Sequence, residues 1–198
     1  MNGTFMDALK NRRTIYTLGA DSPLPQQKIV QLVKEAAAHA PSAFNSQSAR
    51  VALLFGEKHG RFWSIVLETL RGCVPAGQFD RTERKIAGFS GGFGTALYFD
   101  DTAVTERFAA EFPLYADRFE IWAEQANGML QFAVWTLLEE AGLGVNLQHY
   151  DPLIDDAVRA EFKIPANWRL IAEMPFGAPL APPNVKAFAE IDERVILP

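Results

Sequence analysis

The hydrophobic positions along the chain alternate between helical stripes and short continuous runs. A short helix is predicted over 4–10, with Thr4 as its N-cap, and a longer one that ends at Ala40 before a proline. Another helical stripe covers 62–69. Three apolar runs predict strands separated by helices, and we expect the first of them to be covered on both faces: 51–55, 95–99 and 168–174.

The longest pattern is an amphipathic helix over 117–141. From 129 to 138 only Gln131 and Thr136 are polar, so this half is apolar nearly all round. Such a helix must be covered on several sides, either in the centre of a domain or at a subunit interface. Gly128 costs about 1 kcal/mol of helix stability relative to alanine, which suggests a close approach of another backbone or a ligand, with ordinary helix packing favoured.

Two segments interrupt the regular pattern. Residues 72–94 contain glycines and charges, and we expect a mobile surface segment there. A proline-rich stretch over 175–183 begins an extended arm that ends in the apolar run 195–197. With 198 residues and no internal repeat, the chain predicts a single domain, 1–198, in which 176–198 form a C-terminal arm.

Composition narrows the class of protein. The formal net charge is −5 without a long basic run, which argues against nucleic acid or an anionic membrane surface as the partner. Cys73 is the only cysteine, so no disulfide can form within the chain, and a reducing compartment is favoured. Neither a signal core nor a stretch of ~18 apolar residues is present. We therefore expect a cytoplasmic protein that does not span a membrane.

The residues of hydrolytic and metal catalysis form no known motif. His39, His59 and His149 stand outside any nucleophile elbow or paired-histidine zinc helix, so we expect neither a catalytic side chain nor a metal site. Adjacent acidic residues point in different directions, which favours solvated charge. The glycine run 91–94 lacks a following lysine and precedes a strand, which favours a flexible turn over a phosphate loop.

Three segments point to a common chemistry when they are taken together. Arg12-Arg13-Thr14 places two cations and a hydroxyl after a helix, a set that can hold a phosphate. The loop 41–47 groups amide and hydroxyl side chains, and an amide both donates and accepts hydrogen bonds, as the pyrimidine edge of a flavin requires. The run 142–144 ends the long helix with a glycine cap that leaves backbone N–H groups beside it.

In this order the three segments resemble the FMN-dependent nitroreductase family. The similarity covers most of the chain, and 12–16, 40–50, 142–150 and 176–179 resemble the subgroup named for fatty-acid repression mutants. The resemblance implies an α+β fold with a mixed sheet wrapped by helices and a long helix in an extensive dimer interface. It also implies a homodimer in which the C-terminal arm crosses to the partner and which acts on a small-molecule acceptor.

The resemblance assigns FMN contacts to both subunits, while the flavin itself performs the chemistry. The residues it implies are Arg12, Arg13 and Thr14 at the phosphate and ribityl chain, with Arg194 and Lys186 completing phosphate binding; Ser42, Asn45 and Gln47 from the partner subunit along the flavin; and the backbone of Leu143 and Gly144 near N5 of the ring.

Aromatic residues raise two further points. Tyr16 stands where many nitroreductases carry an arginine or lysine near the flavin pyrimidine, and the subgroup shares an aromatic there. A cation at that place would favour the reduced anionic ring, so the flavin potential stays open. Phe112, Phe119 and Trp122 could line an acceptor pocket, although aromatic residues at helical spacing more often belong to a core.

The sequence therefore predicts an FMN-dependent oxidoreductase that passes electrons from NADH or NADPH to nitroaromatics, quinones or similar acceptors by a ping-pong route. A second interpretation is a flavin-binding redox sensor that regulates lipid metabolism through a protein partner. A third is a flavin-free binding module on the same fold. Steady NAD(P)H turnover separates the first two, and the colour of the purified protein tests the third.

Overall fold

An antiparallel sheet forms the centre of the molecule. The computed structural model describes residues 4–197, and their strands are β1 (Leu18–Gly19), β2 (Ala49–Phe55), β3 (Gly94–Asp101), β4 (Gly144–Val145) and β5 (Trp168–Pro179). They follow the order β1-β5-β3-β2, and β4 pairs with β5. An isolated bridge between Thr14 and Val145 adds the parallel contact of the sheet.

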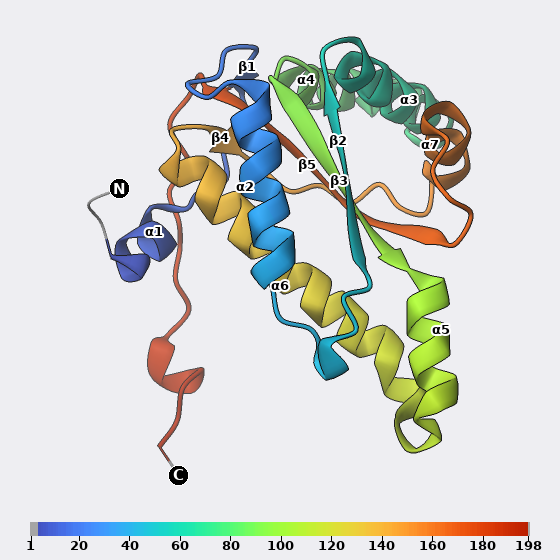
Figure 1. The fold of residues 1–198 in the computed structure, drawn as a ribbon. Coiled ribbons are helices and arrows are strands. Elements are labelled where there is room, and N and C mark those ends of the chain that lie inside the picture. The colour runs from blue at the N-terminus through green and yellow to red at the C-terminus, as the bar shows by residue number, and fades with distance from the viewer. Residues whose placement is uncertain (1–3, 198) are drawn as a thin grey trace.

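Helices cover both faces of this sheet, which confirms the α+β class. Their bounds are α1 (Phe5–Asn11), α2 (Gln26–His39), α3 (Glu57–Cys73), α4 (Phe79–Ser90), α5 (Thr102–Glu111), α6 (Phe119–Glu140) and α7 (Asp155–Phe162). Figure 1 shows α2 and α6 side by side on one face and α3, α4 and α7 on the other. In the described part of the chain, no helix has both the length and the apolar character needed to cross a membrane.

Every residue of strand β3 is buried. Successive residues point to opposite sides of a sheet, so both faces of this strand are covered. Ala96 and Tyr98 pack with α2 and α6, whereas Leu97 and Phe99 pack with α3, α4 and α7. The strand predicted over 95–99 is thus confirmed, and it separates two hydrophobic clusters. This two-sided burial fixes the helices on either side of one central strand.

The first predicted strand also forms, but its expected burial was wrong. Strand β2 is the last in the sheet order, so it has a neighbour on one side only. Most of its residues are half-buried, and Leu54 is the fully buried one. An edge strand leaves unpaired backbone groups and part of its faces uncovered within its own chain.

Helix α4 occupies the region for which a mobile segment was predicted, so that prediction was wrong. Ile86 and Phe89 are 2% and 0% exposed and belong to the cluster formed with α3. Gly88 permits a close approach, because a Cβ there would lie 2.9 Å from the Tyr16 carbonyl oxygen. The prediction missed this helix because its buried apolar face consists of these two residues, and glycines and charged residues surround them in the sequence.

The C-terminal arm is exposed, and it begins later than predicted. Residues 176–179 belong to β5, while 180–197 are exposed. In Figure 1 the arm passes α1 and leads away from the body of the molecule. Gly128 also differs from expectation, since it is exposed and a Cβ there would meet no described atom within 4 Å.

The end of α6 is closed by a glycine, as the sequence predicted. Gly142 has a φ of 88°, and its N–H donates to the Glu139 carbonyl at 2.9 Å. The Leu143 N–H donates to the Leu138 carbonyl at 3.0 Å. These two bonds form the Schellman motif, which satisfies the last carbonyls of a helix and needs a left-handed residue.

We expect Gly142→Ala to lower the free energy of unfolding by about 1 to 2 kcal/mol, because an L side chain is strained at this φ. Gly60→Ala is the matched control, since Gly60 lies inside α3 and a Cβ there meets nothing within 4 Å. The control should gain about 0.5 to 1 kcal/mol from its helix propensity. Urea unfolding of both variants measures the difference, and an unchanged or stabilised Gly142→Ala would contradict the left-handed cap.

Candidate cofactor site

Three cations meet where the N-terminal segment passes the beginning of the arm. Arg12 and Arg13 directly follow α1, and Lys186 lies in the arm. With Thr14 and Tyr16 they line a cavity of about 280 Å³. Four of these residues, all but Tyr16, were assigned to FMN by the resemblance. The structure therefore brings together predicted residues from near the two ends of the chain.

The C-terminal end of α6 holds the arginine pair. Glu139 accepts the backbone N–H of Arg13 on Oε2 at 2.7 Å and the indole N–H of Trp135 on Oε1 at 3.0 Å. The Arg12 guanidinium lies over the Trp135 ring, 4.5 Å from its centre. A cation is attracted to an aromatic face and to a nearby carboxylate. Two side chains one helical turn apart thus position both arginines.

The segment behind the arginines is fastened to the sheet. The Ile15 N–H donates to the Val145 carbonyl at 2.9 Å, and the Asn146 amide donates to the Ile15 carbonyl at 2.8 Å. The Arg13 guanidinium donates to the carbonyl of Asn184 in the arm. The pair is therefore presented from a fixed backbone, as binding groups require for a defined geometry.

The second half of the predicted site is a strained loop at the end of α2. In the short 3₁₀ helix η1 (Ala43–Asn45) and just after it, φ is 55° at Phe44, 51° at Asn45 and 49° at Gln47. Such values are uncommon outside glycine and persist only where surrounding structure holds them. Ser42 Oγ accepts the Gln47 N–H at 3.0 Å, while the side chains of Asn45 and Gln47 are exposed.

The two halves lie far apart in one chain. Phe44 packs on Trp122, near the beginning of α6, whereas Glu139 and the arginine pair lie at its C-terminal end. From Trp122 to Glu139 the helix rises by about 26 Å at ~1.5 Å per residue. Seven of the ten predicted residues thus form two groups, one at each end of this helix: Arg12, Arg13, Thr14 and Lys186, and Ser42, Asn45 and Gln47.

The three remaining predicted residues also lie outside the cation-lined cavity. Leu143 and Gly144 are buried in their own chain, and the Leu143 N–H is bonded to the Leu138 carbonyl. A Cβ at Gly144 would lie 3.1 Å from Ile15, so this glycine serves close packing. Arg194 lies in the exposed arm just after the short helix η4 (Ile191–Glu193). Their roles at a cofactor stay predictions.

The aromatic residues considered for an acceptor pocket gather around Phe44. Its ring centre lies 4.7 Å from that of Phe112, 5.4 Å from that of Phe119 and 5.9 Å from that of Trp122. Phe119 is 3% exposed and belongs to the core, while Phe112 and Trp122 are half-buried. The cluster therefore supports the loop and leaves part of its aromatic surface open.

Sequence reasoning missed the residues that position the arginines. Trp135 and Glu139 stand at i and i+4, a spacing at which two side chains on a helix can meet. The contact that matters, from Glu139 to Arg13, joins residues 126 positions apart. Nothing in the sequence pattern links them, so the fold was needed to find this carboxylate.

His59 is structural, as expected, with Nδ1 2.8 Å from Thr95 Oγ1.

Comparison with known proteins identifies the family. Residues 9–178 match the model of the nitroreductase family. Two Saccharomyces cerevisiae proteins named as nitroreductases are similar over nearly the whole chain. HBN1 is 36% identical over 194 residues, which are 97% of this chain and 96% of the relative. FRM2 is 31% identical over 188 residues, which are 94% and 93% of the two chains.

Solved structures agree with this assignment. The nitroreductase CinD from Lactococcus lactis, in complex with chloramphenicol, is 40% identical with a TM-score of 0.90, and the match covers 98% of this chain and 100% of CinD. CinD was also solved with 4-nitrophenol. A Desulfovibrio desulfuricans protein in complex with FMN shares the fold at 16% identity and a TM-score of 0.72, over 100% and 99% of the two chains.

The fold and these matches define an oxidoreductase, and the chain belongs to the nitroreductase family. Within the family, the match to FRM2 confirms the resemblance to the Frm-type subgroup.

The carboxylate of Glu139 makes stability depend on pH. Burial raises the pKa of Glu139 from 4.5 to about 7, although hydrogen bonds from Trp135 and Arg13 and the charges of Arg12 and Arg13 oppose the shift. The folded state therefore binds this proton more tightly than the unfolded state. The contribution of Glu139 to stability is complete below about pH 4.5 and is lost as the pH rises through about 7.

We expect the wild-type free energy of unfolding to fall relative to that of Glu139→Gln as the pH increases over this range. Glutamine keeps the size of the side chain and removes its titration, so the comparison isolates the carboxyl group. Urea unfolding at several pH values measures both proteins. Parallel pH profiles for the two proteins would show that Glu139 titrates as it does in the unfolded chain.

Proposed function

We propose that the protein is an FMN-dependent oxidoreductase that reduces nitroaromatics, quinones or similar small acceptors with NADH or NADPH by a ping-pong route. The observation that carries the proposal is the meeting of Arg12, Arg13 and Lys186 with the Thr14 hydroxyl at one cavity of an otherwise acidic chain. A phosphate monoester carries close to two negative charges at neutral pH. Guanidinium groups bind its oxygens in pairs, so this donor set fits the phosphate of FMN.

The acceptor class is supported by the structural relatives. Chloramphenicol and 4-nitrophenol, the molecules bound in the CinD structures, are both nitroaromatic compounds. In this chain Asn45 and Gln47 are exposed in the same loop as Phe44, whose side chain is 46% exposed. An aromatic acceptor can pack against such a ring face.

FMN supplies the two-electron chemistry when it is bound, and the protein supplies binding and orientation. Arg12, Arg13 and Lys186 neutralise the phosphate at one end of the cofactor. The amides of Asn45 and Gln47 offer donors and acceptors to the pyrimidine edge of the ring. In this proposal no side chain acts as an acid, a base or a nucleophile.

A second copy of the chain completes the site. The phosphate cavity and the loop 42–47 lie at opposite ends of α6, so a flavin contacted by both is shared between two chains. An apolar groove of about 560 Å³ between α1, α2 and α6 supports this arrangement, and its lining includes Phe5, Met129, Phe132 and Ala133. An apolar groove that is open at the surface of a single chain is typical of an interaction site.

The arm offers the complementary surface. Val185 and Leu197 are 100% exposed and Phe188 is 80% exposed, so the described part of their own chain leaves these side chains almost uncovered. The open edge of β2 lies beside a cavity of about 410 Å³ that Val51 and Trp168 help to line. An arm exchanged between two copies covers apolar side chains and protects a sheet edge in one step.

We expect the purified protein to be yellow, to release FMN and not FAD on denaturation, and to lose its visible flavin absorbance when NADH or NADPH is added without oxygen. Arg13→Ala should weaken FMN binding by about 1.5 to 3 kcal/mol, the scale of a charge-assisted hydrogen bond. Titration of the apoprotein with FMN measures this loss.

Lys10→Ala is the control for this experiment, because it removes one positive charge from α1 outside the cavity. Its FMN affinity should equal that of the wild type. A colourless protein that does not bind added FMN would refute the proposed function. An unchanged affinity in Arg13→Ala would remove Arg13 from the phosphate site.

We expect Ala133→Glu to abolish both the dimer and the bound flavin. Ala133 lines the apolar groove, and a carboxylate enclosed there by a second copy would be buried without a partner. Dimerisation and binding at a shared site are thermodynamically linked, so both are lost together. Sedimentation velocity with detection of flavin absorbance measures the two properties in one sample.

Ala160→Glu is the matched control, because it makes the same substitution at an exposed position of α7, away from the groove and from the loop 42–47. This variant should remain a flavin-loaded dimer. A soluble monomer of Ala133→Glu that still carries FMN would refute the shared site.

A further inference from the structure

Three residues of the loop 42–47 have positive φ, although its regular structure consists of the short 3₁₀ helix η1. Its internal hydrogen bonds are short-range: the Asn45 N–H donates to the Ser42 carbonyl at 3.0 Å, and the Gln47 amide donates to the Asn45 carbonyl at 3.3 Å. Left-handed backbone at non-glycine residues reverts unless neighbours oppose it. The neighbours that do so are Phe119 and Trp122 of α6, together with Arg50 and the segment 101–118.

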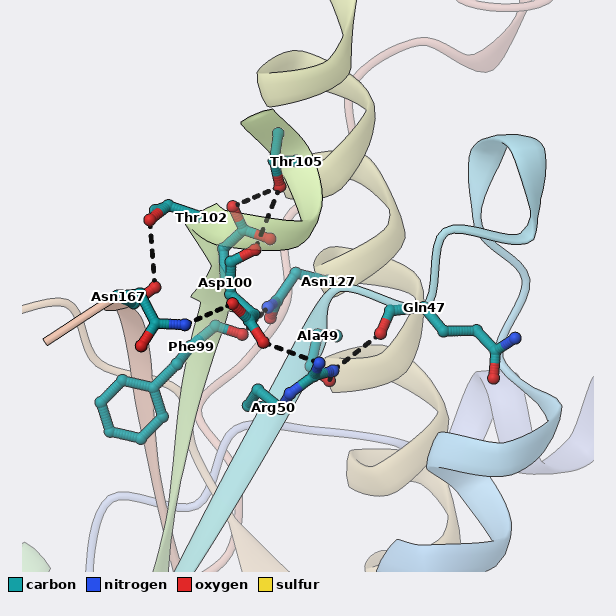
Figure 2. A network of polar contacts seen from close by, with 10 residues as sticks. Gln47, Ala49, Arg50, Phe99, Asp100, Thr102, Thr105, Asn127 and Asn167 are labelled. Carbon is teal, nitrogen blue, oxygen red and sulfur yellow. Dashed lines mark hydrogen bonds and ion pairs between the residues drawn. The ribbon is translucent and has the colours of Figure 1, made fainter. Parts of the chain in front are cut away.

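Arg50 fastens the C-terminal side of the loop. Its Nη1 donates to the Gln47 carbonyl at 2.7 Å and to the Ala49 carbonyl at 3.1 Å. Its Nη2 donates to Asp101 Oδ2 at 2.8 Å, an ion pair in which the Asp101 side chain is 12% exposed. Figure 2 shows the Gln47 carbonyl facing Arg50 while the Gln47 side chain points away from it.

Asp101 is itself held at the end of β3. Asn167 donates from Nδ2 to Asp101 Oδ1 at 2.6 Å. The Asn167 carbonyl accepts the Thr102 N–H at 2.8 Å and the Thr102 hydroxyl at 3.1 Å (Figure 2). Both Asp101 oxygens therefore have partners, and the ion pair rests on a strand end and the beginning of α5.

The same segment fastens the N-terminal side of the loop. After α5 the chain continues into the 3₁₀ helix η3 (Pro113–Arg118). Phe112 and Tyr115 from this region place their ring centres 4.7 Å and 6.0 Å from that of Phe44. Aromatic contacts at these distances oppose a rotation of Phe44 out of its left-handed conformation.

We propose that Arg50 and Asp101 are positioning residues that hold the loop 42–47 in its flavin-binding conformation. Asp101 and the rest of the segment 101–118 anchor the loop to the body of the protein. The inference rests on the proposed function, because that function has the loop 42–47 contact FMN. Arg50 and Asp101 would act on the loop without contacting the cofactor themselves. Holding Asn45 and Gln47 in place before binding removes the cost of ordering them when FMN binds. It also fixes the backbone from which their amides extend.

Arg50→Gln tests this role, because it removes the ion pair and keeps a side chain of moderate length. We expect its FMN dissociation constant to rise by about tenfold, together with a shift of the visible absorption band of the flavin that remains bound, as a misplaced contact group would cause. Arg50→Lys keeps the charge and one donor, and it should recover part of the affinity. If Arg50 acted through its charge alone, Arg50→Lys would recover affinity but would not restore the position of the absorption band.

Arg61→Gln is the matched control. Arg61 forms an ion pair with Glu161 at 3.0 Å on the far helices α3 and α7, and it is not near the loop. Its flavin affinity and spectrum should equal those of the wild type. Thermal unfolding of both variants shows whether Arg50→Gln has lost more than its loop.

Hydrogen exchange of the apoproteins provides a measurement without cofactor. The amides of Asn45, Ser46 and Gln47 should exchange faster in Arg50→Gln than in the wild type and in Arg61→Gln. Asp101→Asn should act in the same direction, and the double variant should add little to either single change, because the two residues act as a unit.

The outcomes separate this proposal from the proposed function. A wild-type protein that binds no FMN refutes the proposed function, and the exchange measurement then decides whether the loop is held by Arg50. A wild-type protein that binds FMN, with an Arg50→Gln variant of unchanged affinity, spectrum and exchange, overturns the positioning role. Additive effects of the two substitutions would also overturn it, since they would show that the ion pair is not what holds the loop.

Discussion

The packing of helix α6 along one face of the sheet is the constraint on which the other features depend. Its N-terminal half supports the loop 42–47 through Phe119 and Trp122, and its last turns hold the arginine pair through Trp135 and Glu139. Because a helix of this length is stiff, the two groups cannot approach each other within one chain. Any shift of α6 along its axis would move both groups together.

Buried amide side chains oppose such a shift. Asn127 and Gln131 are 0% and 7% exposed in the middle of α6, on a helix face that is otherwise apolar. Asn127 donates to the Phe99 carbonyl of β3 at 3.0 Å, and Gln131 donates to Asn127 Oδ1 at 2.8 Å. A buried polar group without a partner is costly, so these bonds favour one register of the helix on the sheet.

Much of the fold could be predicted from the sequence because its signals are local. The long helix, its glycine cap and three strands follow from periodicity and from the residue types at their ends. The edge position of β2 could not be predicted, since it depends on strand order and not on the strand itself. Helix α4 was missed because Ile86 and Phe89 carry its burial among glycines and charges.

The site could be predicted only in part, for a related reason. The sequence reveals Arg12, Arg13 and the loop 42–47, because their residue types and their order along the chain resemble those of the family. Their supports are Glu139 and Asp101, and each of these acidic residues stands next to another acidic residue. Sequence reasoning interpreted such pairs as solvated charge. For each pair the structure gives one member a long-range partner, which the spacing along the chain could not reveal.

These supports have a consequence for how the two half-sites form. Each is held by residues from other elements of the same chain, so folding of the single chain already orders the arginine pair and the loop. In the proposed dimer the free energy of association then need not order them, and it can come from the apolar groove and the arm. A shared site built in this way differs from one in which the partner folds the loop. Here the partner would supply contacts to the cofactor, while each subunit keeps the geometry of its own half.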